Sequence, residues 1–160
     1  CPKVVRLSAF GAMDTTFVAY TYPFSVPIKY NRIHSILQQP NGTLLVGGGY
    51  EIADDHRGYF DRWNSNGSKD WTFNRGTGLT GYAGTIIQQP DGKLLVGGPF
   101  VAYNGVPKFG IMRLNADGTL DPEFNPGSGP NRTISAVALQ PDGKIMIAGE
   151  FEFYNGIAFK

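Results

Sequence analysis

Three arginine–aspartate pairs recur along the chain at one spacing and are the first residues to consider for chemistry. They are Arg6 with Asp14, Arg62 with Asp70, and Arg113 with Asp121. Glycosidases use carboxylates as general acids and bases, but they need two carboxyl groups with different pKa values around one cleft. An active site is single, whereas these pairs recur, and nothing in the sequence selects two carboxylates for such a cleft. We therefore predict structural ion pairs and no catalytic residues, with a carbohydrate-active enzyme only as the third interpretation.

Residues that bind metals are scarce. The chain has two histidines and one cysteine, Cys1, so neither an internal disulfide nor a cysteine-based metal cluster can form. The cluster Asp54-Asp55-His56 is expected in a loop, where solvated charge is the simpler interpretation. Residues 115–121 carry oxygen ligands at alternate positions, as a calcium loop does, but the corresponding stretches elsewhere do not keep them. We predict a turn there, no metal and no cofactor, and leave calcium at Asp117 open.

A glycine-rich stretch formally matches a dinucleotide-binding fingerprint at Gly76, Gly78 and Gly81. That fingerprint must follow a strand and open a helix, because the helix N-terminus binds the pyrophosphate. Here the stretch opens a strand instead, and Gly127-Ser128-Gly129 occupies the equivalent place further along. We predict a linker between structural units.

One connection carries the best candidates for binding. From Phe17 to Pro40 the chain advances 23 positions, against 17 between the corresponding residues further along. The inserted stretch, residues 18–31, contains two prolines and four predicted contact residues, namely Tyr20, Tyr22, Phe24 and Tyr30. A proline-stiffened loop with exposed rings loses little entropy on binding and suits a protein interface or a sugar ring. The alternative is that these rings fold back to cover an edge of the core.

The elements that position these residues are repeats. LQQPNGTLLVGG at residues 37–48 returns as IQQPDGKLLVGG at residues 87–98 and as ALQPDGKIMIAG at residues 138–149. A second block alternates with the first and reads RLSAFGAMDTTF, RWNSNGSKDWTF and RLNADGTLDPEF. A period of about 50 residues with several strands per unit is typical of propellers or stacked β arrays, in which one unit cannot bury its own apolar faces.

Four short antiparallel strands are expected in each unit. Strand A covers residues 33–38, 85–89 and 133–140, and a Pro-Asx-Gly turn reverses it into strand B at residues 43–47, 93–97 and 144–148. Strand C ends at Leu7, Trp63 and Leu114, and strand D runs to Phe17, Phe73 and Phe124. Strand B is apolar without alternation, which suits a sheet covered on both faces. The sequence thus predicts an all-β, β-propeller-type fold of about three blades.

The hairpin between strands C and D has a definite register. Centring it on the three-residue turn 116–118, with Gly118 in the left-handed bulge position, places Arg113 opposite Asp121. The same count pairs the other two arginines with their aspartates. Strand parity also predicts that Trp71 packs in the core.

Composition limits the class of protein. The 22 glycines and 11 prolines among 160 residues argue against long helices, and 41% apolar with 13% aromatic residues is too much for a disordered chain. Fourteen basic against 13 acidic residues leave a net charge of +1, which predicts no strong attraction to nucleic acid or acidic membranes. No run of 18 apolar residues exists, so no membrane span is predicted.

The units follow the pattern A-x-x-x-QPDGK-Φ-Φ-Φ-GG-F-x-x-YNG, followed by RLNADGTLDPEF, and this resembles the delta-60 repeat family over nearly the whole chain. QPDGKLLVGGPFVAYNG and QPDGKIMIAGEFEFYNG match best. The first unit departs after Gly49, where Asp54-Asp55-His56 replaces a Tyr-Asn-Gly. The resemblance implies propeller-like repeats in large surface, secreted or phage-borne proteins of bacterial origin, and it identifies no ligand.

These observations divide the chain into five segments. Residues 1–17 are strands C and D of a preceding blade, 18–32 the aromatic connection, 33–73 blade 1, 74–124 blade 2, and 125–160 the first half of blade 3. Because the last blade is expected to lack strands C and D, we expect a longer parent chain or, less favoured, a homo-oligomer. Cys1 is either a lipidated mature N-terminus or simply the first residue of the segment.

We expect a non-enzymatic scaffold that serves as an interaction or adhesion platform in an extracellular, cell-surface or virion protein, such as a phage tail or fibre. Its expected partners are other protein subunits or further repeats of a parent chain. A glycan-binding lectin of the same fold is the alternative. Nucleic acid is not among the expected partners.

Overall fold

The computed structural model describes residues 4–21, 30–52 and 55–158, and in these ranges all regular elements are β-strands. The expected all-β class is therefore confirmed. The strands in chain order are β1 (Tyr30–Gln38), β2 (Leu44–Ile52), β3 (Asp55–Trp63), β4 (Leu79–Gly81), β5 (Thr85–Gln88), β6 (Leu94–Gly97), β7 (Phe100–Tyr103), β8 (Val106–Pro107), β9 (Ile111–Leu114), β10 (Ile134–Leu139), β11 (Ile145–Gly149), β12 (Phe153–Tyr154) and β13 (Ile157–Ala158). The described residues contain no helix that could cross a membrane.

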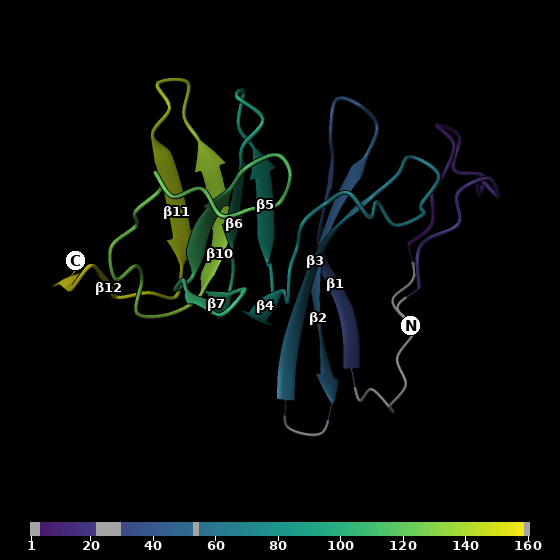
Figure 1. Ribbon diagram of the computed structural model, residues 1–160. Helices are drawn as coiled ribbons and strands as arrows, with labels where there is room; N and C mark the ends of the chain where they lie inside the picture. Colours follow the sequence, from purple (N-terminus) through teal and green to yellow (C-terminus); the bar gives the residue numbers. More distant parts are fainter. Residues whose placement is uncertain (1–3, 22–29, 53–54, 159–160) are drawn as a thin grey trace.

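The strands fall into three successive antiparallel groups that stand side by side in Figure 1. β1, β2 and β3 pair in order in the first unit, β5, β6 and β9 in the second, and β10 with β11 in the third. The first strand of the second unit, β5, contacts both β1 and β10. β4 joins the units, because it pairs with β3 on one side and with β7 on the other. This is the arrangement of consecutive propeller blades, with strand A innermost.

The three hairpins that begin near Arg6, Arg62 and Arg113 have the predicted register but a shorter ladder. Leu114 bridges Leu120, Trp63 bridges Lys69, and Leu7 bridges Met13. In the second unit the Asn115 N–H donates to the Thr119 carbonyl at 2.8 Å, and the turn glycine between them has φ +93°. The predicted bulge turn is therefore confirmed, while strand D is reduced to a single bridge.

The ladder stops at the aspartate that follows each bridge. The Asp14 and Asp70 carboxylates each accept the backbone N–H of the residue two positions on, at 2.9 Å, and Asp121 does the same at 3.0 Å. An Asx turn of this kind offers the backbone a partner other than the neighbouring strand. The chain consequently leaves the sheet at this point instead of continuing as a full fourth strand.

The first unit differs from the second at the connection between strands B and C. In the second unit, Asn104 and Gly105 have φ values of 53° and 75° and make a two-residue hairpin between β7 and β8. In the first unit β2 and β3 pair without interruption over nine residues each, whereas in the second unit the ladder between β6 and β9 stops at Gly97 and Ile111, and β7 pairs with β4 instead. The expected loop position of Asp54-Asp55-His56 is wrong for Asp55 and His56, which belong to β3, while Asp54 lies outside the described residues.

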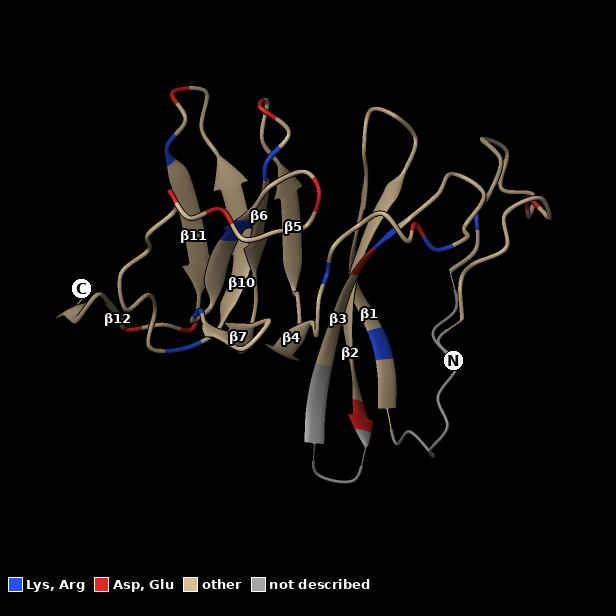
Figure 2. Cartoon of the chain, in the orientation of Figure 1, with Lys and Arg blue, Asp and Glu red and all other residues tan. Residues whose placement is uncertain are grey.

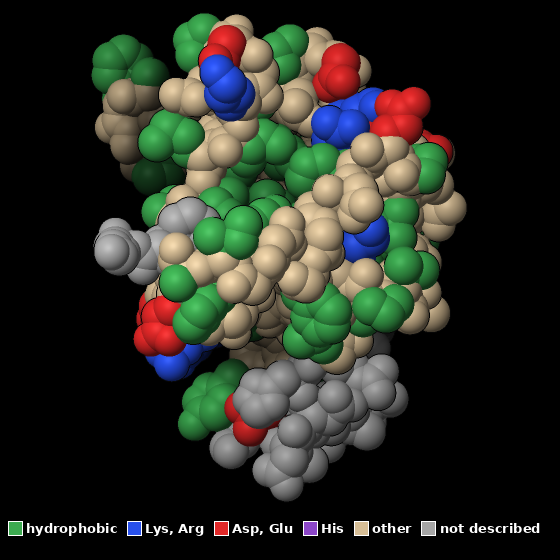
Figure 3. Space-filling model, turned by 90° about the vertical axis from the view of Figure 1, so that its left-hand side faces the viewer, with side chains coloured by type: hydrophobic (Ala, Val, Ile, Leu, Met, Phe, Trp, Pro, Cys, Tyr) green, Lys and Arg blue, Asp and Glu red, His purple; other side chains and the backbone are tan. Residues whose placement is uncertain are grey.

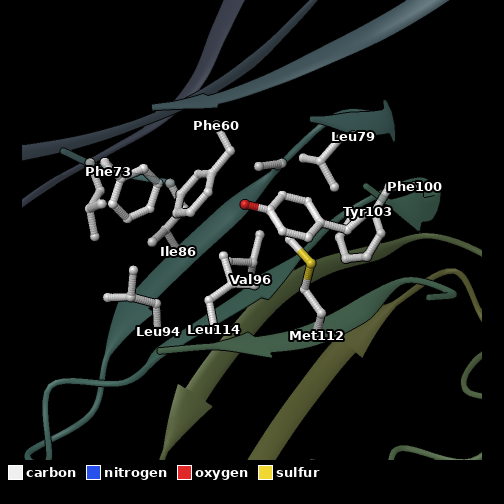
Figure 4. Close-up of a cluster of buried hydrophobic side chains, with 12 residues drawn as sticks. Phe60, Phe73, Leu79, Ile86, Leu94, Val96, Phe100, Tyr103, Met112 and Leu114 are labelled. Atoms are coloured by element: carbon white, nitrogen blue, oxygen red, sulfur yellow. The ribbon is translucent and has the colours of Figure 1, made fainter. Parts of the chain in front are cut away.

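The core lies between the units. Strand B of the second unit, Leu94–Gly97, is buried throughout, as its continuous apolar run predicted. Figure 4 shows the rings of Phe60 and Phe73, from the first unit, gathered with Val96 and Leu114 of the second. Each unit therefore buries its apolar faces against its neighbours, as repeat architectures require.

Charged residues are distributed over the described loops and strand ends with both signs interspersed (Figure 2). This distribution accords with the balance of 14 basic and 13 acidic residues.

Candidate functional site

The three arginine–aspartate pairs are present as ion pairs within their hairpins. Arginine Nε lies 2.8, 2.7 and 2.6 Å from aspartate Oδ2 in Arg6–Asp14, Arg62–Asp70 and Arg113–Asp121. Each guanidinium also lies over the phenylalanine that ends its hairpin, between 5.1 and 5.2 Å from the ring centroid. These cation–π contacts add to the ion pairs. Each arginine therefore contacts both the aspartate and the phenylalanine on the opposite side of its hairpin and stabilises the hairpin.

The electrostatics of these carboxylates suit a structural role. A hydrogen bond from Lys93, reinforced by the Glu123 N–H and the partner arginine, outweighs desolvation and lowers the pKa of Asp121 to about 2. Burial alone would raise the pKa of Asp70. Hydrogen bonds from Thr72 and from the paired arginine have a larger effect in the opposite direction, so the pKa of Asp70 lies below its ordinary value. The pKa of Asp14 is likewise lowered, chiefly by hydrogen bonds from Thr16. A general acid at neutral pH needs a raised pKa, which none of these three has.

The sequence leaves calcium binding at Asp117 as an alternative. In the structure the Asp117 carboxylate accepts hydrogen bonds within its own turn. Oδ1 accepts the Thr119 N–H at 3.0 Å and the Thr119 hydroxyl at 2.7 Å. These bonds lower the pKa of Asp117 and stabilise the turn. In the ranges that the structure describes, no group of three or more His, Cys, Asp or Glu residues is placed to hold a metal ion.

The glycine-rich stretch is held by the Tyr-Asn-Gly turn of its own unit. The Asn104 side-chain oxygen accepts the Gly78 N–H at 3.0 Å, and the Asn104 N–H donates to the Gly78 carbonyl at 2.9 Å. Asn155 makes the same two bonds to Gly129, at 2.9 and 3.0 Å. A Cβ on Gly76 would clash with the Asn104 amide, which explains the glycine there. The stretch is a linker. Its Gly78 N–H already donates a hydrogen bond to Asn104, whereas a phosphate-binding loop needs backbone N–H groups that can donate to the phosphate.

The predicted contact residues occupy different settings. Tyr20 is half-buried and packs against the cluster of Phe17 and Trp63, so it covers an edge of the core. Tyr22 and Phe24 lie outside the described residues. Tyr30 is 51% exposed and lines a pocket.

The expected core position of Trp71 is wrong, because this side chain is 76% exposed. Its ring meets the Tyr20 ring edge-on at 6.2 Å, and the Lys69 Nζ lies 4.7 Å from its centroid. Strand parity fails here because the Asx turn at Asp70 takes the chain out of the sheet before Trp71.

A pocket of about 270 Å³ lies between the first and second units. Its lining residues come from three segments and are Tyr30, Arg32 and His34 of β1, Gly49, Tyr50 and Glu51 of β2, and Gly81 and Tyr82 before β5. Burial alternates along β1, so its three lining residues project from one face of the strand. We call this site the aromatic pocket.

Ring contacts order the side chains of the aromatic pocket. His34 stacks on Tyr82 with 4.2 Å between ring centroids and 14° between planes. The Arg32 guanidinium lies 5.7 Å from the centroid of Tyr30. Burial, and secondarily the charge of Arg32, lower the pKa of His34, so its imidazole is neutral at neutral pH. With Glu51 the pocket combines flat apolar faces, one cation and one carboxylate, a set suited to holding a ring-shaped or aromatic group in a fixed orientation.

Sequence reasoning found Tyr30 and missed the rest of the aromatic pocket. The pocket depends on how the second unit is placed against the first, and no local pattern encodes that placement. One signal was present, because the first unit departs from the repeat after Gly49, next to Tyr50 and Glu51.

Comparison with known proteins supports the repeat architecture. A family model described as a β-propeller domain of unknown function (DUF5122) matches residues 39–73, 89–124 and 140–158. The three matched segments fall one in each unit and together cover more than half of the chain. Neither the curated proteins nor the solved structures contain a match. The propeller-type expectation is confirmed, and the chain belongs to the DUF5122 β-propeller family.

Proposed function

We propose that this chain is a non-enzymatic propeller scaffold of the delta-60 repeat type that presents the aromatic pocket to a macromolecular partner. The parent assembly is an extracellular, cell-surface or virion structure, in which the domain serves in adhesion or attachment. The observation that carries the proposal is the composition of the aromatic pocket, in which Tyr30, Tyr50 and Tyr82 are supplied by two different units.

Rigid strands suit this pocket to recognition. β1 and β2 are paired along the whole length of β1, so Tyr30 and Tyr50 are attached to ordered backbone. Tyrosines on a rigid element give a large contact area at low entropy cost, and they are enriched where proteins bind other proteins. The stacked His34 and Tyr82 rings extend this surface across the boundary between units.

The test compares the chain with a variant in which Tyr30 and Tyr82 are replaced by serine, and with Trp71→Ser as the matched control. Trp71 is an exposed aromatic residue outside the aromatic pocket. Quantitative affinity capture from the native source should recover a partner with the wild type and with the control, and lose it with the pocket variant. Equal recovery by all three proteins, or none by any, would overturn this proposal.

A glycan ligand is the second candidate, and the stacked rings beside Arg32 and Glu51 favour it. A sugar ring presents an apolar face that an aromatic ring can cover, and hydroxyl groups that a guanidinium and a carboxylate can bind. A glycan array followed by calorimetric titration separates this candidate from a protein partner. Saturable sugar binding that is lost in the pocket variant supports a lectin, and silence on the array removes that candidate.

Two further experiments test the proposals that this chain is not an enzyme and that its parent assembly is exposed on a cell or particle surface. Incubation with the glycans from the array should leave them chemically unchanged, and a turnover that depends on this chain would contradict the proposal. Protease treatment of intact cells or particles should cleave the parent protein, whereas full protection until lysis would contradict surface exposure.

A further inference from the structure

We propose that the surface around Trp71 binds sugars that carry a carboxylate, such as the uronic acid residues of an acidic polysaccharide. This surface, which we call the Trp71 site, consists of Lys69, Trp71, Asn74 and Arg75. It shares no residue with the aromatic pocket, so the proposal does not rest on the function proposed above. Trp71→Ser also remains a valid control for the aromatic pocket.

Four residues in and beside the hairpin of residues 62–73 depart from the repeat together. The corresponding residues of the other two hairpins are uncharged at all four positions. Asp61 stands in place of Val5 and Met112, Lys69 in place of Met13 and Leu120, Trp71 in place of Thr15 and Pro122, and Arg75 in place of Ala19 and Pro126. A binding site is single, whereas elements of the fold recur, so residues that leave the repeat as a group are candidates for binding.

The structure brings these four residues into one cluster. The Asp61 carboxylate is 1% exposed, and its Oδ1 lies 3.2 Å from Lys69 Nζ and 3.1 Å from Arg75 Nε. Lys69 is itself buried. Its Nζ lies 4.7 Å from the centroid of the Trp71 ring, so the fourth residue contacts the same cluster.

Stability alone does not account for the buried charges. In the second unit the equivalent residues are apolar, with Met112 fully buried and Leu120 packed against the hydrophobic core. Burial of an ion pair costs desolvation free energy, and an apolar pair of similar volume is often at least as stable. The charged residues of the first unit therefore point to recognition.

The cluster has one positive charge in excess among the described residues. Lys69 and Arg75 face the single carboxylate of Asp61. The neighbouring Asp70 is paired with Arg62 at 2.7 Å and leaves the balance unchanged. One excess positive charge matches the single negative charge of a carboxylate.

Two side chains of the Trp71 site have donors available for a ligand. Arg75 directs Nε to Asp61, and its two Nη groups have no acceptor among the described residues. Asn74 is exposed, and its side-chain amide makes no hydrogen bond within the described part of the chain. A guanidinium can donate to both oxygens of a carboxylate, and an amide can donate to or accept from a sugar hydroxyl.

Trp71 supplies a flat face for a sugar ring. Its ring meets the Tyr20 ring edge-on at 6.2 Å and has the Lys69 ammonium against one face. These contacts orient the ring although the side chain is 76% exposed. An indole ring held in this way can cover the apolar face of a pyranose.

The ring and the donors line one hollow. A pocket of about 380 Å³ is bounded by Lys69 and residues 71–76, a volume within the range of roughly 300–1,000 Å³ typical of small-molecule sites. The hollow that Figure 3 shows over the third unit has a different lining, which is chiefly hydrophobic. A charged sugar therefore suits the Trp71 site and not that hollow.

The Trp71 site lies inside the array of units. The hairpin of residues 62–73 is bonded to the hairpin before it, because Arg6 Nη1 donates to the Ser65 carbonyl at 2.7 Å. It is also bonded to the hairpin after it, because Arg62 Nη1 donates to the Ala116 carbonyl at 2.8 Å. Both neighbouring hairpins are thus in place around the site.

Exposure at this position is a property of the repeat. Pro122 occupies the position of Trp71 in the second unit and is exposed as well. The first unit therefore places a large aromatic ring where the repeat is open to solvent.

Fluorescence titration tests the proposal. The chain has two tryptophans, and Trp63 is 1% exposed, so a change of emission on binding reports Trp71. The probes are trisaccharides of glucuronic acid and of galacturonic acid, the neutral trisaccharides of glucose and galactose, and a sulfated form of each neutral probe. We expect saturable binding of at least one acidic trisaccharide, about tenfold or more tighter than that of its neutral counterpart. Added salt should weaken the binding of the acidic probe only.

Variants measured by calorimetry assign the binding to the site. Trp71→Ala should weaken it about tenfold, and Arg75→Gln should reduce the affinity for the acidic trisaccharide to that for the neutral one. Arg75→Lys keeps a positive charge beside Asp61, so the fold is retained, but it should still weaken binding because an ammonium lacks the two-pronged geometry. Arg132→Gln, at an exposed arginine outside the site, is the matched control and should bind as the wild type does.

Four results would overturn the proposal. They are the absence of binding by every acidic trisaccharide, equal affinity for acidic and neutral probes, binding that survives both Trp71→Ala and Arg75→Lys, and tighter binding of a sulfated probe than of either uronic acid probe. Binding that Trp71→Ala retains and the variant of Tyr30 and Tyr82 loses would also overturn it, because the sugar would then occupy the aromatic pocket.

Discussion

Replacing Asn104 by alanine removes two favourable features of the second unit at once. The Gly78 N–H is buried and loses its acceptor, and an unsatisfied buried group of this kind costs about 1–3 kcal/mol. Residue 104 also has φ 53°, a left-handed conformation that costs an ordinary L-residue about 1–2 kcal/mol. We expect the free energy of unfolding to fall by about 2–5 kcal/mol, the sum of the two contributions.

Asn104→Gly separates the two contributions. Glycine adopts positive φ without strain, so this variant loses only the hydrogen bond to Gly78 and should cost about 1–3 kcal/mol. Urea unfolding followed by the emission of Trp63, which is 1% exposed, measures both variants. The comparison is made at one protein concentration, because association would add to the apparent stability. A loss below about 0.5 kcal/mol for alanine, or equal losses for alanine and glycine, would refute the reasoning.

Three other perturbations have defined outcomes. Because the folded pKa of Asp121 is about 2, below the unfolded value of roughly 3.9, its stabilisation is complete above pH ~4 and lost as pH falls towards 2. Urea midpoints at pH 5 and pH 2.5 should therefore differ less in Asp121→Asn than in the wild type, and an unchanged pH dependence would contradict this. Gly48→Ala places a Cβ against a backbone carbonyl of β1 and should lower thermal stability strongly, whereas Gly84→Ala, with nothing nearer than 3.6 Å, should be tolerated. Tyr103→Phe leaves a buried carbonyl without its donor and should cost about 1–3 kcal/mol in urea unfolding; a neutral result would contradict the bond.

Local chemistry made part of this fold predictable. The Asp-Gly turn at Gly118 determines the hairpin register within a few residues, so Arg113 and Asp121 could be paired from the sequence alone. The continuous apolar run of strand B likewise predicted burial on both faces, because a half-exposed strand would alternate.

Features that depend on the relation between distant segments were not predictable in this way. β2 and β3 remain paired to their ends, whereas in the second unit the ladder stops after Gly97 and β7 pairs with β4, an exchange of partners that no local pattern indicates. The prediction that Trp71 packs in the core was wrong because the strand ends just before it, where the Asp70 carboxylate accepts the Thr72 N–H. The aromatic pocket joins Tyr30 to Tyr82 across two units, and the alternation along β1 could place Tyr30 on a face without indicating what lies opposite.

The stack of His34 on Tyr82 gives the most direct test of the account, because it joins the first unit to the second and forms one wall of the aromatic pocket. Urea unfolding of the wild type, His34→Ala, Tyr82→Ala and the double variant measures the coupling free energy between the two rings. The account predicts a favourable coupling of about 0.5–1.5 kcal/mol, the range of aromatic pairs. Strictly additive losses of stability in the double variant would contradict the placement of the second unit against the first.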